Sequence, residues 1–160
     1  MITTFQVRGW NPAPQGSKTY MGHGVMVESC KQVKYWRSVV TGEALKACKQ
    51  MLLGQVHLDI EFVFSRPKSH YGSGRNAAKL KESAPVLHSN KPDLSKLIRS
   101  TEDALTNIAY KDDSQVCKIS SLKRYADQGE LPGAIITIRP FDLKLVNKTV
   151  LSALTGQVYS

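Results

Sequence analysis

The sequence predicts an α+β fold in which a small mixed sheet packs against two main helices. Apolar residues recur at spacings of three and four in residues 31–52 and 93–108, the pattern of amphipathic helices. Short segments rich in β-branched and aromatic residues predict strands at 2–8, 56–64, 115–120 and 134–138. The 160 residues have the length of one domain and can bury a core without a metal or disulfide.

The first third of the chain alternates strands, turns and one helix. After the strand at 2–8, two prolines and a glycine predict a loop at 11–18, and residues 25–27 suit a short strand. The helix at 31–52 has an apolar face: Val33, Trp36, Val40, Ala44, Ala47, Cys48 and Met51. Gly54 then ends it. The strand at 56–64 alternates apolar with mostly polar residues, so we expect one buried and one mostly polar face.

Residues 65–91 show no sustained periodicity and are strongly basic. Their charged side chains are six positive and one negative, for a net charge of +5: Arg66, Lys68, Arg75, Lys79, Lys81 and Lys91 against Glu82. Such a long irregular stretch within a small domain is usually functional or disordered. Its charge predicts a segment that contacts DNA or RNA, and the alternative is a solvated flexible loop.

The helix at 93–108 has the best apolar stripe in the chain: Leu94, Leu97, Ile98, Thr101, Ala104, Leu105 and Ile108. The face predicted to point outward carries Asp93, Lys96, Arg99, Ser100 and Asp103. A polar turn at 111–114 leads to the strand at 115–120, and a turn at 127–133 leads to the last strand. Residues 1–140 form the predicted domain, and residues 141–160 a C-terminal extension with a short amphipathic helix at 144–155.

Charge is the first functional signal. The formal net charge is +9, which favours a polyanionic partner such as nucleic acid, with a merely solvated basic surface as the alternative. No run of 18 apolar residues and no signal-peptide pattern occur, so we expect a cytoplasmic protein without a membrane partner or a small-molecule substrate. The three cysteines are widely spaced and predict reduced thiols rather than a zinc site.

Three aspartates suggest a metal site. Asp93 opens the second helix, and Asp112 and Asp113 stand in the turn after it. A helix of about 15 residues is roughly 22 Å long, so these carboxylates converge only if the following chain runs back along the helix. If they do, their hard oxygen ligands suit Mg²⁺ or Mn²⁺. An Asp-Asp turn on its own is more often only a turn.

The segment from Lys91 to Val116 reads KPDLSKLIRSTEDALTNIAYKDDSQV. Its D-A-L and D-D-x-Q-V pieces, with the aspartate near its start, resemble the signature of the RusA family, the Holliday-junction resolvases of bacteria and bacteriophages. The resemblance implies a small α+β homodimer that binds four-way DNA junctions and makes paired, Mg²⁺-dependent nicks in opposing strands, with Mn²⁺ as a substitute. The resemblance also implies a role in DNA recombination and repair.

Carried over by position, Asp93 matches the first metal-binding aspartate of the family and Asp113 the essential second one, with Asp112 as its neighbour. Asp103 matches the aspartate of D-A-L, for which we favour a structural role across the dimer. Two positions depart from the family pattern. Ser95 replaces the second aspartate of D-x-D and is followed by Lys96, and Arg99 replaces the catalytic lysine. Arg99 can stabilise negative charge on phosphate but is a poor proton donor.

We therefore expect an altered but active site with Asp93, Asp112, Asp113 and Arg99 as catalytic residues, the three aspartates also binding metal. Basic residues predicted to contact DNA are Lys18, Arg66, Lys68, Arg75, Lys79, Lys81, Lys91 and Lys96. Tyr20 and Tyr71 are candidate wedges between bases, whereas packing is the preferred role of Trp10.

Three other functions remain open at this point. Ser95 favours a junction-binding protein with weak or no cleavage. A nuclease specific for flaps or forks fits the same residues. An RNA-binding domain fits poorly, because Phe62 and Phe64 fall on the face predicted to be buried.

Overall fold

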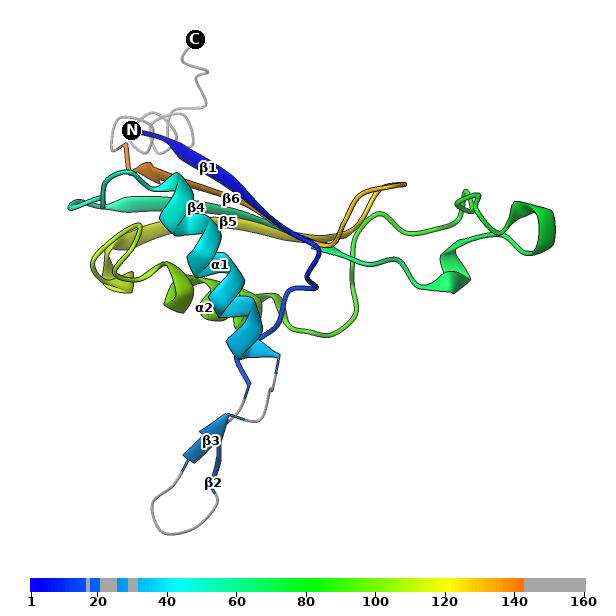
Figure 1. Ribbon diagram of the computed structural model, residues 1–160, viewed down its shortest axis with the longest axis horizontal. Coiled ribbons are helices and arrows are strands. Elements are labelled where there is room, and N and C mark those ends of the chain that lie inside the picture. Colours follow the sequence, from blue (N-terminus) through cyan, green and yellow to red (C-terminus); the bar gives the residue numbers. More distant parts are fainter. Residues whose placement is uncertain (17, 21–25, 29–31, 143–160) are drawn as a thin grey trace, which may run out of the picture.

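The computed structural model describes residues 1–16, 18–20, 26–28 and 32–142, with the side chains of 18–20 and 26–28 left out. One sheet contains four strands: β1 (Thr3–Arg8), β4 (Val56–Phe64), β5 (Val116–Tyr125) and β6 (Gly133–Pro140). Their order is β1-β6-β4-β5; β5 is parallel to β4, and the other neighbours are antiparallel. The mixed sheet with its two main helices confirms the predicted α+β class (Figure 1).

The two helices cover one face of this sheet. Both α1 (Val33–Ala47) and α2 (Leu94–Leu105) pack their apolar stripes into one core with the sheet, which includes Trp36, Val40, Leu58, Phe62, Leu97 and Leu105. Two polar contacts join the helices inside this core. The Trp36 indole donates to Thr101 Oγ1 at 3.1 Å, and the Thr41 hydroxyl donates to the Ala104 carbonyl at 3.0 Å.

The helices are shorter than their periodicity predicts. The first ends at Ala47 because Cys48 turns to extended backbone with ψ 100°, and the second ends at Leu105 because Thr106 does the same with ψ 137°. Ser100 was predicted to point outward and is instead fully buried. Its hydroxyl donates to the Ala13 carbonyl at 2.7 Å, so it ties the loop at 9–16 to α2.

The strands also differ from expectation in burial and length. His57 and Val63, on the face of β4 predicted to be polar, are 8% and 2% exposed, because β4 is a central strand flanked on both sides. The predicted strand at 115–120 continues to Tyr125 as β5. Residues 121–125, which the prediction left out, show little alternation in the sequence, because β5 is an edge strand whose residues are mostly exposed or half-buried.

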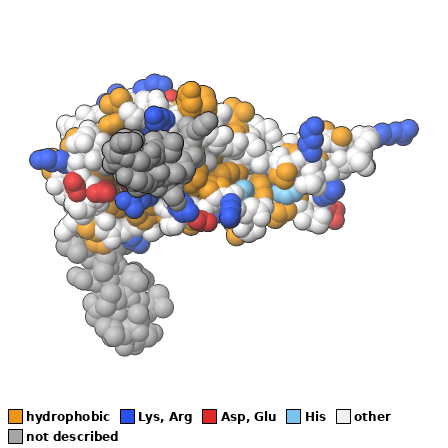
Figure 2. All heavy atoms as spheres, turned by 90° about the horizontal axis from the view of Figure 1, so that it is seen from below, with side chains coloured by type: hydrophobic (Ala, Val, Ile, Leu, Met, Phe, Trp, Pro, Cys, Tyr) orange, Lys and Arg blue, Asp and Glu red, His pale blue; other side chains and the backbone are white. Residues whose placement is uncertain are grey.

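Two segments project from this body (Figure 1). One is the hairpin of β2 (Lys18–Tyr20) and β3 (Met26–Glu28). The other comprises residues 65–91, here called the arm, which contains the 3₁₀ turns Lys68–His70 and Gly74–Asn76. The arm closes on itself, since the Gly72 N–H donates to the Lys79 carbonyl and the Lys81 N–H to the His70 carbonyl, both at 2.9 Å. Figure 2 shows Lys and Arg side chains along it and at its end.

The base of the arm is bound to β5. The Tyr125 N–H donates to the Val86 carbonyl at 2.9 Å, and the His88 N–H donates to the Lys123 carbonyl at 3.0 Å. His88 also stacks on Phe64 with ring centroids 4.1 Å apart. The irregular basic stretch is therefore a folded projection with an anchored base.

Within the described ranges, no helix has the length and apolar character needed to cross a bilayer. The predicted helix at 144–155 lies outside the described residues, as do most of the extension and Cys30.

Candidate functional site

Acidic side chains crowd the outer side of α2 near its C-terminal end. Burial raises the pKa of Glu102, and the nearby charges of Asp113 and Asp103 raise it further, while Arg99 opposes them. Burial likewise raises the pKa of the Tyr110 hydroxyl, with the same three acidic residues adding to the shift. We call Glu102, Asp103 and Asp113 the acidic face. Asp113 and Asp103 both act on Glu102, so the surface around Glu102 is negative and favours a cation, while Asp103 itself is paired with Arg37.

Asp112 and Gln115 hold the turn that presents Asp113. Asp112 Oδ1 accepts the Ser114 N–H at 2.9 Å, and these contacts with Ser114 lower the pKa of the Asp112 carboxyl. The Gln115 side chain accepts the Asp112 N–H at 3.1 Å, which completes a capping box. Its amide group also donates to the Leu52 and Gly54 carbonyls at 3.0 and 2.8 Å. The D-D-x-Q sequence therefore fixes the turn, and its second aspartate, Asp113, is exposed beside Glu102.

Asp93 lies at the other end of α2. It is the N-cap residue but makes no side-chain capping bond, and its carboxylate pairs with Lys96 Nζ at 3.1 Å. The strand β5 does run back along the helix, as convergence requires. It brings Lys123 to this end, where the ammonium group donates to the carbonyls of Asn90 and Pro92 at 2.8 and 2.7 Å.

The structure does not gather the three predicted metal ligands into one cluster among the described residues. In the part of the chain that the structure describes, no three His, Cys, Asp or Glu residues are grouped so that they could hold a metal ion. Asp93 is separated from the acidic face by about two turns of helix. The donor chemistry still fits a hard divalent cation, because Mg²⁺ keeps several waters and needs only one or two carboxylates.

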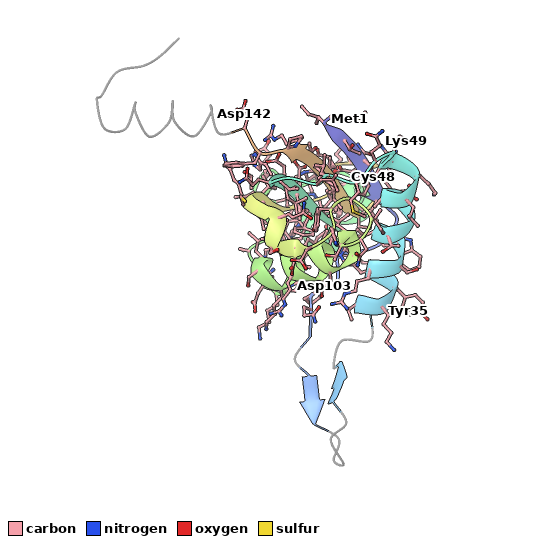
Figure 3. The ribbon with its side chains drawn as sticks, turned by 90° about the vertical axis from the view of Figure 1, so that its left-hand side faces the viewer. Met1, Tyr35, Cys48, Lys49, Asp103 and Asp142 are labelled. Carbon is pink, nitrogen blue, oxygen red and sulfur yellow. The ribbon has the colours of Figure 1, made fainter. Side chains whose placement is uncertain are left out.

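The remaining predicted residues on α2 are exposed to solvent. Ser95, Lys96 and Arg99 lie on its outer surface, and Arg99 is close enough to Glu102 to lower the pKa of that carboxyl. Asp103 has a structural contact, as predicted, but its partner is Arg37 on α1 of the same chain. Figure 3 shows Asp103 among the side chains on the outer side of the molecule.

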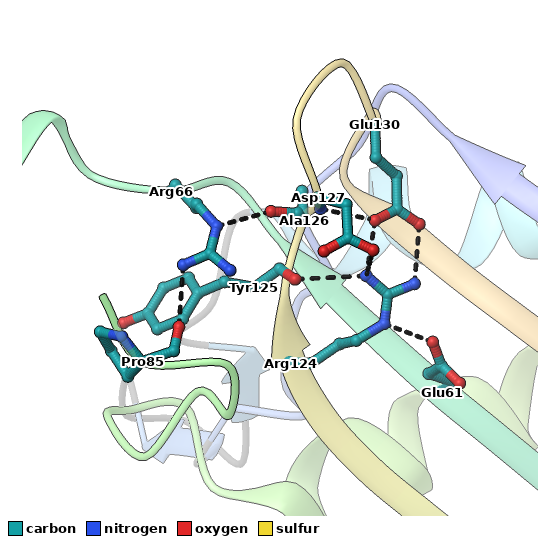
Figure 4. A network of polar contacts seen from close by, with 8 residues as sticks. All are labelled: Glu61, Arg66, Pro85, Arg124, Tyr125, Ala126, Asp127 and Glu130. Atoms are coloured by element: carbon teal, nitrogen blue, oxygen red, sulfur yellow. Dashed lines mark hydrogen bonds and ion pairs between the residues drawn. The ribbon is translucent and has the colours of Figure 1, made fainter. Parts of the chain in front are cut away.

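The basic residues predicted to contact DNA fall into two groups. Lys68, Arg75, Lys79 and Lys91 are exposed, all of them on the arm, with Lys91 at its end. Arg66 is instead part of the fold, since it donates to the carbonyls of Ala126 and Pro85 at 2.7 and 2.8 Å and lies over the Tyr125 ring (Figure 4). Lys81 donates to the Ser69 carbonyl at 2.9 Å. The side chains of Lys18 and Tyr20 lie outside the described residues.

Sequence reasoning missed Glu102. A helical projection could have found it, because Glu102 is three residues after Arg99 and next to Asp103 in the T-E-D-A-L segment. Asp113 comes from a separate turn, and its charge acts on Glu102 only once the chain is folded.

Fold and surface define a small, basic α+β protein with an acidic helix face and a basic arm. The family model of endodeoxyribonuclease RusA matches residues 10–139, which is most of the chain. The chain therefore belongs to the RusA endodeoxyribonuclease family, whose members are DNA-binding nucleases of the Holliday-junction resolvase type. It is also similar to the "Uncharacterized protein YqaN" of Bacillus subtilis (strain 168), with 29% identity over 96 residues, which are 59% of this chain and 67% of that protein.

Proposed function

We propose that this protein is a divalent-metal-dependent endonuclease that resolves four-way DNA junctions by paired nicks in opposing strands. The charged cluster of Asp113, Glu102 and Arg99 is the observation that carries the proposal. Its carboxylates are half-buried or exposed and have the donor atoms that Mg²⁺ or Mn²⁺ prefers. Family membership supports the same chemistry on DNA.

In this proposal, Asp113 and Asp93 hold the metal ion and Asp112 sets the position of Asp113. A bound Mg²⁺ supplies polarisation of the scissile phosphate and a water of lowered pKa. Arg99, and Lys96 one turn before it, stabilise the negative charge that develops on phosphate. Arg99 remains protonated throughout, so it does not serve as the general acid.

We propose that the active form is a homodimer. Two symmetric nicks require two sites related by a two-fold axis.

DNA contacts in this proposal come from the exposed cations of the arm, including Lys91, with Lys96 next to the site. Contacts of this kind to phosphates are independent of sequence and weaken as salt rises. We place the protein with its branched DNA in the cytoplasm of a bacterium or a phage-infected cell. We assign the nuclease activity to residues 1–140 and treat 141–160 as an extension, which the end of the family match at residue 139 supports.

The test is strand cleavage of a labelled, immobile four-way junction with Mg²⁺, Mn²⁺ or EDTA, beside a linear duplex, flaps and forks. Metal-dependent paired nicks in the junction are expected. Cleavage confined to flaps or forks would keep the nuclease and change its substrate.

Ser95 favours a second candidate, a junction-binding protein with weak cleavage. Tight junction binding without cleavage under any metal supports this candidate. Ser95→Asp then restores the missing carboxylate beside Asp93 and should switch cleavage on. If Ser95→Asp leaves an already active enzyme unchanged, the serine is tolerated.

A further inference from the structure

Two aromatic rings on the surface of the domain lie parallel to each other. Trp10 follows β1 and Tyr35 lies in the first turn of α1, with ring centroids 6.4 Å apart and planes within 4°. The two residues are 48% and 66% exposed, so the rings leave much of their surface open to solvent. Figure 3 shows Tyr35 at the N-terminal end of α1, pointing away from the sheet. The sequence favours core or surface packing for Trp10, and the ring packs on Tyr35 at the surface while half of it stays exposed.

These rings border a cavity of about 310 Å³. Its lining combines aromatic surface with two side-chain amides: Gly9, Trp10, Asn11, Gln32, Tyr35 and Trp36. Pockets for small ligands have volumes of about 300 Å³ and more. A cavity at this lower end suits one flat ring system. Amide groups can both donate to and accept from the edge of such a ring.

The walls of the cavity are fixed by the fold. The N–H groups of Gly9 and Trp10 both donate to the Pro132 carbonyl, at 2.8 and 3.2 Å. Gly9 has φ +85°, a conformation that favours glycine and that turns the chain so that Trp10 faces α1. Asn11 Oδ1 accepts the Ser65 N–H at 3.1 Å, which links the cavity to the start of the arm. Trp36 is 1% exposed and belongs to the core.

The cavity is directly connected to the helix that carries the candidate site. The loop that begins at Trp10 continues to Ala13, whose carbonyl accepts the Ser100 hydroxyl, and to Gln15, whose N–H donates to the Lys96 carbonyl at 2.9 Å. Five residues of extended chain span at most about 18 Å. The cavity therefore lies within a few nucleotides of Lys96 and Arg99.

We infer that the cavity bordered by Trp10 and Tyr35 binds one unpaired nucleobase of the DNA substrate. Stacking on aromatic faces recognises any base, because every base has a π-face. The four arms of a junction meet where pairing and stacking are interrupted, so a base is freed there at less cost than in a duplex. The inference rests on the proposed function only in taking DNA as the partner.

Tryptophan fluorescence tests this site directly, because Trp10 and Trp36 are the two tryptophans of the chain and Trp36 is buried. Titration with a short oligothymidylate in EDTA should quench the emission of Trp10. An abasic oligomer of the same length has the same phosphates and no bases, so it should not. Equal quenching by both oligomers, or by neither, would overturn the base site.

Variants test the two rings by binding of the same oligomers. Trp10→Ala and Tyr35→Ala should each weaken oligothymidylate binding roughly 5- to 150-fold, the range for loss of one base–aromatic stack. Binding of the abasic oligomer should be unchanged. Trp10→Phe and Tyr35→Phe keep a ring and should retain most of the affinity, and Leu53→Ala, at another exposed apolar residue, should retain all of it.

If the alanine variants bind oligothymidylate as tightly as the unaltered protein, the proposal is wrong. If the alanine variants do not fold, the phenylalanine variants and the quenching experiment still decide whether the cavity binds a base. Because all these measurements are made in EDTA, their outcome is independent of junction cleavage. Quenching without cleavage would support the base site and remove the nuclease proposal, and cleavage without quenching would do the reverse.

Discussion

The surroundings shift the pKa values of two glutamates in this protein in opposite directions. At the base of the arm, Arg124 binds Glu130 through both terminal nitrogens and Glu61 through Nε (Figure 4). These hydrogen bonds lower the pKa of Glu130 to about 2. On α2, burial and the charges of Asp113 and Asp103 raise the pKa of Glu102. Glu130 is neutralised by a guanidinium, whereas Glu102 has like charges around it that Arg99 only partly opposes.

The difference separates acids that hold the fold from acids that are available for a ligand. The carboxylates paired with Arg124 join β4, β5 and the turn between β5 and β6. A cluster of like charges costs stability, and such clusters occur where a protein needs the charge for another purpose. The comparison therefore favours the side of the molecule that carries α2 as the functional side. Variants that remove members of either group, or cations of the arm, test this contrast.

Asp113→Asn should have the largest effect. It removes a metal ligand in the proposed site, and metal ions contribute several kcal/mol to the transition state, so junction cleavage should fall at least about 100-fold. Cleavage of labelled junctions with Mg²⁺ measures the loss. Asp127→Asn removes an 82% exposed carboxylate near Arg124 and is the matched control. Similar loss of activity in both variants would contradict the assignment of Asp113.

Arg124→Met should destabilise the protein by about 1–3 kcal/mol. The side chain is only 17% exposed, and its loss leaves Glu61 and Glu130 without their partner. Denaturant unfolding measures this difference in the free energy of unfolding. Arg75→Met, on the exposed part of the arm, should stay within about 0.5 kcal/mol. Equal stabilities of the two variants would show that the network at the arm base is not structural.

The same contrast explains what the sequence could predict. The fold class, the strand at 56–64 and the apolar face of the second helix follow from periodicity, because repeated burial leaves a repeated pattern. The family motif located Asp93, Asp112 and Asp113 along the chain. The sequence could not show that Asp113 acts on Glu102, because their proximity depends on how the turn at 111–115 folds against α2. The pairing of Asp93 with Lys96 joins residues three apart on one helix, which the spacing alone allows.

Charge is equally ambiguous in the arm. Its six cations together predict a DNA-binding segment, yet Arg66 is bonded to the backbone of Ala126 and Pro85 whereas Arg75 is exposed. Net charge measures the field of a segment and does not distinguish a cation that binds a carbonyl from one that is free for a phosphate. Ser100 is misplaced by the sequence pattern for a similar reason, because a serine on a helix can donate to a buried carbonyl as readily as to water.

The arm provides the next test of this distinction. Replacing Arg75 and Lys79 together by alanine should weaken junction binding and lower the slope of log affinity against log salt by about 0.9 for each phosphate that is no longer neutralised. Binding titrations at several salt concentrations measure the slope. Lys34, exposed on α1, and Lys46, which pairs with Glu43, give a double alanine control of the same charge. An unchanged slope in the arm variant would remove the arm from the DNA interface.

The smallest expected effect is on the pH dependence of stability in variants of Glu130 and Glu102. Glu130 has a lowered pKa, so its stabilising contribution is present above its ordinary value near 4.5 and is lost as pH falls towards about 2. Glu130→Gln should therefore lower stability at neutral pH. The raised pKa of Glu102 means that its folded form holds the proton more tightly, so stability falls as pH rises through and above the ordinary value of 4.5.

Glu102→Gln should accordingly raise stability at neutral pH, and the gain should disappear in acid, where Glu102 is already protonated. Denaturant unfolding across this pH range measures both variants against the unaltered protein. Shifts of the same sign for Glu102→Gln and Glu130→Gln would contradict the contrast. Opposite signs would mean that the acidic face of α2 costs stability at the pH where the protein works, as expected of carboxylates placed there to bind a cation.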